Sequence, residues 1–322
     1  MMGRDAVLAR TRPIALPHGL RPALLAMPVT MMSVTMLVLA ATALLPPGVQ
    51  RLCALAAIIV LGVPHGALDG EIARSLLQSR LGVRLGGWFR WAWFPIFSPP
   101  YLALAAGVLI AWRVLPMPTL AAFLAASAWH FGSEDAPGRH VEVAVRGGLP
   151  IAAPLLVHPA ATWAVFATVA NVAQPQMPGW LRAASLLWLV LAVAWAGRVA
   201  FRGQARLLAL PALLIGLFIV LPPLTAFAIY FVCLHAPAHT KALIQDARRA
   251  PRVRDAGSAI VLALPITALT LAIGAVLWPF YAGAAPDRLL SLTLQGLAAL
   301  TLPHMLLDAL ATALLARPQS TS

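Results

Sequence analysis

Five of the eight histidines in this 322-residue chain lie within or at the ends of long apolar stretches. They occur in four short segments: Val63-Pro-His-Gly-Ala-Leu-Asp69, Trp129-His-Phe-Gly-Ser-Glu-Asp135, Leu234-His-Ala-Pro-Ala-His-Thr240 and Leu302-Pro-His-Met-Leu-Leu-Asp308. Ionisable side chains are costly in such surroundings and therefore indicate function. Neutral imidazole binds iron, copper, zinc and nickel. The candidates for one metal site are His65, His130, His235, His239 and His304.

The spacing within these segments also favours metal chemistry. His235 and His239 form an i, i+4 pair, which places both rings on one helix face where they can bind one ion. Each of the other three histidines is followed four residues later by a carboxylate: Asp69 after His65, Glu134 after His130 and Asp308 after His304. A metal-bound imidazole usually donates its second N–H to a carboxylate or carbonyl. We therefore expect each carboxylate to orient the histidine of its own segment.

Several other chemistries are excluded, while two alternatives stay open. Cys53 and Cys233 are far apart in apolar runs, so iron–sulfur sites, blue-copper sites and a disulfide framework are not available. Neither the H-E-x-x-H zinc-protease pattern nor the G-x-S-x-G hydrolase pattern is present. A haem- or quinone-linked membrane oxidoreductase stays open, because histidines on separate helices can face each other across a porphyrin. A metal or proton transporter also stays open, although its polar residues should extend through the whole membrane.

The composition indicates which elements must position these side chains. Hydrophobic residues make up 61% of the chain and charged residues 10%, with a mean hydropathy of +0.86, against about 45–50% and about 25% in soluble domains. A water-soluble globule is therefore excluded. We expect an all-α, polytopic integral membrane protein with about ten transmembrane helices. It should form one membrane domain over residues 1–322, with a helical bundle at 22–316 between tails at 1–20 and 317–322.

Charge-free apolar stretches that are long enough for a membrane helix define the spans. We expect them at Pro22–Gln50, Leu52–Leu68, Trp91–Trp112, Val114–Ser133, Gly147–Leu181, Ala183–Gly197, Leu207–Leu221, Leu224–Thr240, Ala256–Pro286 and Leu289–Leu307, the last continuing past Asp308 to Ala316. The seventh and eighth spans come from one long run. We divide it at Pro222-Pro223, because two prolines in succession favour a turn.

The basic residues indicate the orientation of these spans. With the N-terminus inside, nineteen Lys and Arg residues fall on one side and four on the other, and basic loops are retained in the cytoplasm. We therefore expect both termini in the cytoplasm, and we attribute the net charge of +13 to topology, with no nucleic-acid partner. The five histidines all lie on even-numbered spans, about 6–9 Å from the inner face. They should converge at one level.

The histidine segments resemble, in order and approximate separation, those of the Brp/Blh family of integral-membrane beta-carotene dioxygenases. The matching segments extend from Val63 to Asp308. The resemblance implies iron-dependent, non-haem cleavage of the central double bond of beta-carotene by O₂, giving two molecules of all-trans-retinal. It also implies that Fe(2+) is bound by His65, His130, His235 and His239. Four imidazoles leave two positions of an octahedral ion open, and His304 is either a further ligand or a pocket donor.

A carotenoid would reach such a site from the lipid phase. Aromatic residues beside the histidines are candidates for the substrate pocket, where they could stabilise positive charge on the polyene: Trp129, Phe131, Tyr230 and Phe231. We expect a multi-pass protein of a bacterial inner membrane. A rhodopsin is an open candidate for receiving the retinal, and the oligomeric state is left open.

Overall fold

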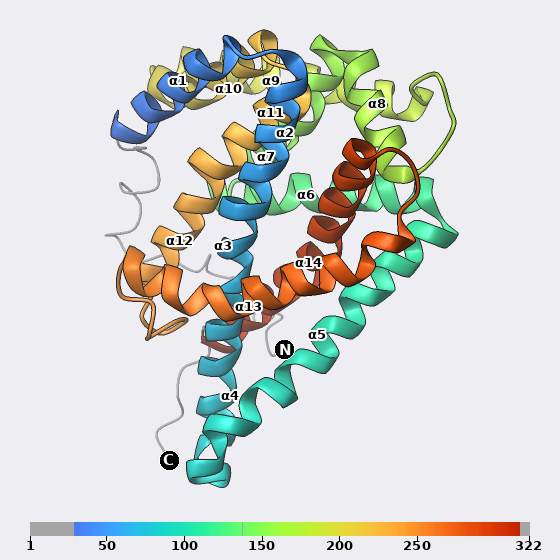
Figure 1. Cartoon of the computed structure of the whole chain (residues 1–322). Coiled ribbons are helices and arrows are strands. Elements are labelled where there is room, and N and C mark those ends of the chain that lie inside the picture. Colours follow the sequence, from blue (N-terminus) through green and yellow to red (C-terminus); the bar gives the residue numbers. More distant parts are fainter. Residues whose placement is uncertain (1–28, 137, 316–322) are drawn as a thin grey trace, which may run out of the picture.

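The computed structural model describes residues 29–136 and 138–315, and all regular elements in these ranges are helical. The all-α class is thus confirmed for the described residues (Figure 1). The helices are α1 (Val29–Ala43), α2 (Pro47–Ala57), α3 (Val63–Ala67), α4 (Asp69–Leu85), α5 (Phe89–Val114), α6 (Pro116–Asp135), α7 (His140–Val157), α8 (Pro159–Ala170), α9 (Gly179–Phe201), α10 (Ala209–Val220), α11 (Pro223–Tyr230), α12 (Ala236–Gln245), α13 (Ala256–Leu277) and α14 (Ala285–Leu315). The two expected tails, and with them the expected position of the termini, lie outside the described residues.

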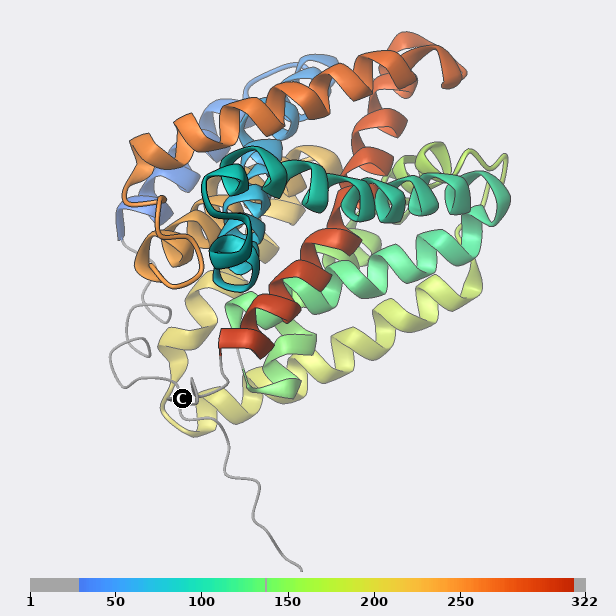
Figure 2. The ribbon, with the colours of Figure 1, turned by 90° about the horizontal axis from the view of Figure 1, so that it is seen from below.

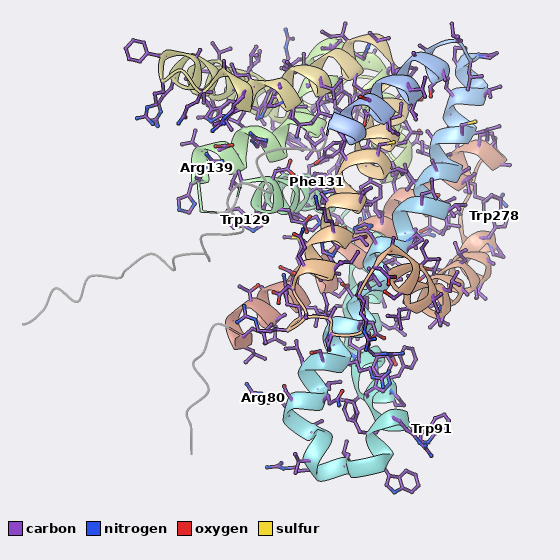
Figure 3. The ribbon with its side chains drawn as sticks, turned by 90° about the vertical axis from the view of Figure 1, so that its left-hand side faces the viewer. Arg80, Trp91, Trp129, Phe131, Arg139 and Trp278 are labelled. Atoms are coloured by element: carbon purple, nitrogen blue, oxygen red, sulfur yellow. The ribbon has the colours of Figure 1, made fainter. Side chains whose placement is uncertain are left out.

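Short irregular turns join several of these helices. Two are π-helical: η1 (Ile58–Gly62) joins α2 to α3, and η4 (Phe231–His235) joins α11 to α12. The 3₁₀ turns are η2 (Gly86–Trp88), η3 (Ala205–Leu208) and η5 (Trp278–Phe280). In Figure 1, α2, α3 and α4 follow one another as a single column. The α4–α5 hairpin, which carries Arg80 and Trp91, projects from the rest of the bundle (Figure 3).

The helices are of the kind that crosses membranes. Six helical stretches of the described chain are long and apolar enough to do so: Pro47–Val114, which reverses at the α4–α5 turn, His140–Val157, Gly179–Phe201, Pro223–Gln245, Ala256–Phe280 and Ala285–Leu315. Shorter apolar helices occupy Ser33–Ala43, Pro159–Ala170 and Ala205–Val220. These lengths indicate a membrane protein, while the count of ten spans and their orientation stay predictions.

Prolines decide where several apolar runs are interrupted. The expected break at Pro222-Pro223 is confirmed, because α10 ends at Val220 and α11 begins at Pro223. Two expected continuous spans are wrong. Pro22–Gln50 is broken before Pro47, which begins α2, and Gly147–Leu181 is broken before Pro159, which begins α8. Proline has no N–H and disfavours helical geometry in the residue before it, so it begins a helix more readily than it continues one.

The bundle places its least covered helices at the periphery. Helices α9 and α13 lie at opposite edges of the view in Figure 2, and few of their residues are buried. Leu187 and Val190 of α9 and Val261 of α13 are all more than 60% exposed. These faces are suited to contact with lipid, whereas the interior is filled by buried residues of α6, α7, α10 and α11.

Helices α6 and α7 approach each other so closely at Gly132 and Gly147 that neither position has room for a side chain. A Cβ atom built on Gly147 would lie 1.8 Å from the carbonyl oxygen of Ala128, and one built on Gly132 would lie 2.0 Å from that of Val143. Small residues permit such backbone contact between membrane helices. Gly132 follows His130 by two residues, so this contact also fixes the position of a histidine.

We expect Gly147→Ala to destabilise the protein, because the added methyl group cannot be placed without separating α6 from α7. Overpacking of this kind costs about 1–3 kcal/mol. The measurement is the thermal unfolding midpoint of the detergent-solubilised protein. Gly216→Ala is the matched control, since no described heavy atom lies within 4 Å of a Cβ at Gly216. Equal midpoints for the two variants would contradict the close contact.

The charge asymmetry of the loops predicts that the turn at Pro222-Pro223 faces outside and that Lys241–Asp255 faces the cytoplasm. A topology reporter fused after Pro223 should therefore read as external, and one fused after Asp246 as cytoplasmic. A cytoplasmic signal after Pro223 would refute the ten-span orientation.

Candidate metal centre

The five histidines of the apolar segments form one buried cluster. His65 lies on α3, His130 on α6, His235 at the end of η4, His239 on α12 and His304 on α14. Their residues are only 2–9% exposed. Neighbouring ring centroids are 5.1–6.0 Å apart, as in His65–His235, His65–His239, His65–His304, His130–His235, His130–His304 and His239–His304. The structure therefore brings all five together from four helical segments.

The two π-helical turns carry histidines into this cluster. Proline clashes with the carbonyl of the residue four before it in an α-helix. For Pro64 that residue is Val60, inside η1, and for Pro237 it is Cys233, inside η4. The wider π turns coincide with the two places where an α-helix would be strained. Nδ1 of His65 makes a hydrogen bond with the carbonyl oxygen of Gly62, the last residue of η1.

The same two turns pack directly against each other. A Cβ on Gly62 would lie 2.4 Å from Cε1 of Phe231, so a glycine is required for this approach. The ring of Phe231 stacks on His235 at 5.6 Å between centroids and meets His65 edge-on at 5.1 Å. One aromatic ring thus contacts two of the imidazoles.

Glu134 is the carboxylate shared by most of the cluster. Its Oε1 accepts a hydrogen bond from Nδ1 of His239 at 2.9 Å. Nδ1 of His235 lies 3.6 Å from Oε2, and Nδ1 of His130 lies 3.8 Å from Oε1. Glu134 on α6 therefore acts mainly on the histidine pair of another helix, whereas we had expected it to orient His130 of its own segment.

The expected pairing of Asp69 with His65 is also not what the structure shows. Helix α3 ends at Ala67 and Asp69 begins α4, so the two residues do not share an undisturbed helix face. Asp69 instead accepts a hydrogen bond from Nδ1 of His304 at 2.7 Å, and its position in the first turn of α4 favours a buried carboxylate.

Asp308 likewise departs from the expectation that it orients His304. Its carboxylate pairs with the guanidinium of Arg249, which follows α12. A charged guanidinium is a stronger partner for a carboxylate than a neutral imidazole is. Asp308 therefore binds the segment that follows α12, which faces the cytoplasm in our predicted orientation. His304 is hydrogen-bonded to Asp69 instead.

The remaining ring nitrogens indicate what the cluster can bind. The Nε2 atoms of His235, His239 and His304 are buried and have no hydrogen-bond partner in the described structure. An unpaired buried polar atom is costly unless a ligand binds it. Two groups of possible ligand atoms lie within 4.8 Å of one another: His130, Glu134 and His235, and Glu134, His239 and His304. These groups could hold a metal ion of the kinds that imidazole and carboxylate prefer.

An apolar cavity of about 670 Å³ adjoins the cluster. Its wall includes His65, His130 and His304. Helix α5 lines it from Phe94 to Leu109, with further walls from α6, α7, α8, α13 and α14. Leu102 of α5 and Leu269 and Leu271 of α13 line the cavity and are 41–44% exposed. The cavity therefore reaches the outer surface of the bundle between α5 and α13.

The aromatic residues expected in the pocket divide into three groups. Phe131 and Phe231 line the cavity. Tyr230 is buried behind Phe131, with ring centroids 5.5 Å apart, and is not part of the wall. Trp129 is 55% exposed, lies on the outer side of α6 (Figure 3) and does not line this cavity. One helical step of about 100° separates it from His130.

The sequence reasoning missed Tyr101. Its hydroxyl donates a hydrogen bond to Oδ2 of Asp69 at 2.8 Å, and the residue also lines the cavity. The signal was present, because Tyr101 is one of three tyrosines in the chain and lies in the middle of an apolar run. Its partner could not be read from spacing, since Asp69 is 32 residues away.

Comparison with known proteins gives a consistent result over most of the chain. Residues 56–311 match the family model described as Beta-carotene 15,15'-dioxygenase. A protein of Halobacterium salinarum, described as a probable beta-carotene 15,15'-dioxygenase Blh, is 31% identical over 290 residues, covering 78% of this chain and 81% of the relative. A beta-carotene 15,15'-dioxygenase of an uncultured marine bacterium is 29% identical over 276 residues, covering 79% and 91%. No solved structure matches the chain.

We expect Glu134→Gln to lower metal affinity about 10–100-fold, because the imidazoles lose the anionic acceptor that orients them. Asp135→Asn is the matched control. The neighbouring residue is turned about 100° away on the helix, so this variant should keep its metal. Metal bound per protein, measured by elemental analysis after dialysis against defined free-metal concentrations, decides between them. Comparable losses of bound metal in the two variants would refute the role of Glu134 in orienting the imidazoles.

Proposed function

The chain belongs to the beta-carotene 15,15'-dioxygenase family, and on this premise we propose that it uses O₂ to cleave the central double bond of beta-carotene. The products would be two molecules of all-trans-retinal. The observation that carries the proposal is the junction of a buried histidine cluster with an apolar cavity that reaches the outer surface of the bundle. The first supplies a metal site and the second a place for a long apolar substrate.

We propose Fe(2+) as the metal and His65, His130, His235 and His239 as its ligands. The fit is supported by the histidine pair, since Glu134 lies near Nδ1 of His235 and His239 while their buried Nε2 atoms have no partner in the described structure. A fixed tautomer and ring orientation are what metal-binding histidines require. When bound, ferrous iron would supply the redox chemistry needed for O₂ to react with an alkene.

The residues around the iron would hold the substrate so that its centre is presented to the site. Along α5, Phe94 lies seven residues before Tyr101 and Leu109 eight residues after it, which is about 10 Å and about 12 Å of helix. Tyr101 is linked through Asp69 to His304, so the cluster faces the middle of the α5 wall. A long polyene lying along α5 would have its central bond, not its ends, nearest to the histidines.

The apolar walls would also control what reaches the reacting bond. The opening beside Leu102 and Leu269 faces outward between helices, so we propose that carotenoid enters from the lipid phase. Phe131 and Phe231 meet the imidazoles and the cavity together, where their faces could stabilise positive charge on the polyene. The site would be in a bacterial inner membrane, from which retinal could pass through lipid to a membrane acceptor such as a rhodopsin.

Neither alternative is favoured by a specific observation. In a bis-histidine haem, two imidazoles would face each other across a porphyrin, but here five imidazoles form one cluster whose neighbouring ring centroids are 5.1–6.0 Å apart. A transporter would need polar groups along its path, whereas the cavity walls away from the cluster are mostly apolar. Purified protein without an intense Soret band would exclude the haem alternative.

We expect His235→Ala to lose iron and retinal formation together, because the variant removes one donor of the i, i+4 pair. The assay is expression in beta-carotene-producing bacterial cells, scored by loss of orange colour and by chromatography of retinal, with iron measured on the purified protein. The control is His140→Ala, since His140 is exposed at the start of α7. Full iron content and normal retinal yield in His235→Ala would refute the proposal.

A further inference from the structure

We propose that His304 is a fifth imidazole ligand of the metal and that Tyr101 positions it through Asp69. This inference rests on the proposed function, because it concerns the metal of the same site. It adds a residue of α5, a helix that contributes no histidine to the cluster.

The first observation is the orientation of His304. Its Nδ1 donates to Oδ1 of Asp69 at 2.7 Å, while its Nε2 is buried without a partner among the described residues. The ring lies 5.1 Å from that of His130 and 5.2 Å from that of His239. His304 therefore has the same arrangement as His239, with one nitrogen bonded to a carboxylate and the other buried without a partner in the described structure.

The second observation is that both oxygens of Asp69 are occupied. Oδ1 accepts from His304 and Oδ2 accepts from the hydroxyl of Tyr101 at 2.8 Å. Two bonds from different helices restrict rotation of a carboxylate that is itself only 3% exposed. Without the tyrosine hydroxyl, one oxygen of a buried anion would lose its donor, and the carboxylate could turn away from His304.

The third observation is that no other carboxylate of the described structure is hydrogen-bonded to His304. His65 is held by a backbone carbonyl, and Glu134 serves His239 with His235 and His130 nearby. Asp308, the carboxylate one turn beyond His304, is paired with Arg249. Asp69 and Tyr101 are therefore the groups that the structure provides for orienting His304.

Tyr101 also connects this arrangement to the substrate cavity. The residue lines the cavity while its hydroxyl points to Asp69. Tyr101→Phe removes only the hydroxyl and keeps the aromatic wall, so it separates the positioning role from the shape of the cavity. Ser98→Ala is the matched control, because it removes another hydroxyl from the same helix and the same cavity wall.

The test is a double-mutant cycle on metal affinity. Purified wild type, Tyr101→Phe, His304→Ala and the double variant are titrated with Co(II), whose visible spectrum reports the number and type of its ligands, and with Fe(II). We expect Tyr101→Phe to weaken binding about 10–100-fold, as orienting partners of metal ligands do. In the His304→Ala background the same change should have no further effect, because residues that act through one another are not additive.

The outcomes separate the two proposals. If wild type binds no metal and forms no retinal, the proposed function fails. If wild type binds metal but His304→Ala leaves the Co(II) spectrum and affinity unchanged, only the fifth ligand is refuted. Additive losses in the double variant would refute positioning by Tyr101, as would an equal loss in Ser98→Ala. Thermal midpoints are recorded for every variant, and Asp69→Asn replaces Tyr101→Phe in the cycle if the latter does not fold.

Discussion

Five imidazoles buried in one cluster impose a requirement that the rest of the bundle must meet. Each ring has two nitrogens, and a nitrogen that faces neither water nor a partner is costly. Hydrogen bonds between helices meet part of this requirement. Glu134 of α6 bonds His239 of α12, and Asp69 of α4 bonds His304 of α14. These links hold helices distant in sequence in register around the cluster. They also leave Nε2 of His235, His239 and His304 buried and without a partner in the described structure.

The local irregularities of the chain serve the same arrangement. Pro64 and Pro237 coincide with π-helical turns, and Gly62 lets those turns meet at Phe231. Gly132 and Gly147 bring α6 and α7 into backbone contact beside His130. π-Helical turns occur often at functional sites. In this chain they allow histidines near proline to face inward without a break in the helical column.

The convergence of the histidines could be predicted from sequence, but their partners could not. Span direction and helical rise place His65 and His304 at one level without knowledge of packing. The partner of Asp69 depends on the end of α3 at Ala67 and on the approach of α14, which no local spacing encodes. Prolines show the same limit. Pro222-Pro223 ends a helix, whereas Pro99-Pro100 lies inside the continuous α5, where packing against α14 and α4 outweighs the local preference.

The opening between α5 and α13 determines which substrate concentration sets the occupancy of the cavity. If carotenoid enters from the lipid phase, as proposed, the cavity would exchange with the bilayer and would hold acyl chains when substrate is absent. Lipid tails are as apolar as leucine, so exchanging a tail for a carotenoid yields little hydrophobic free energy, however large the contact. Selectivity must then come from length, rigidity and fit along α5, and saturation is governed by the mole fraction of carotenoid in the lipid. A cell could change the rate by changing membrane composition while the amount of enzyme stays constant.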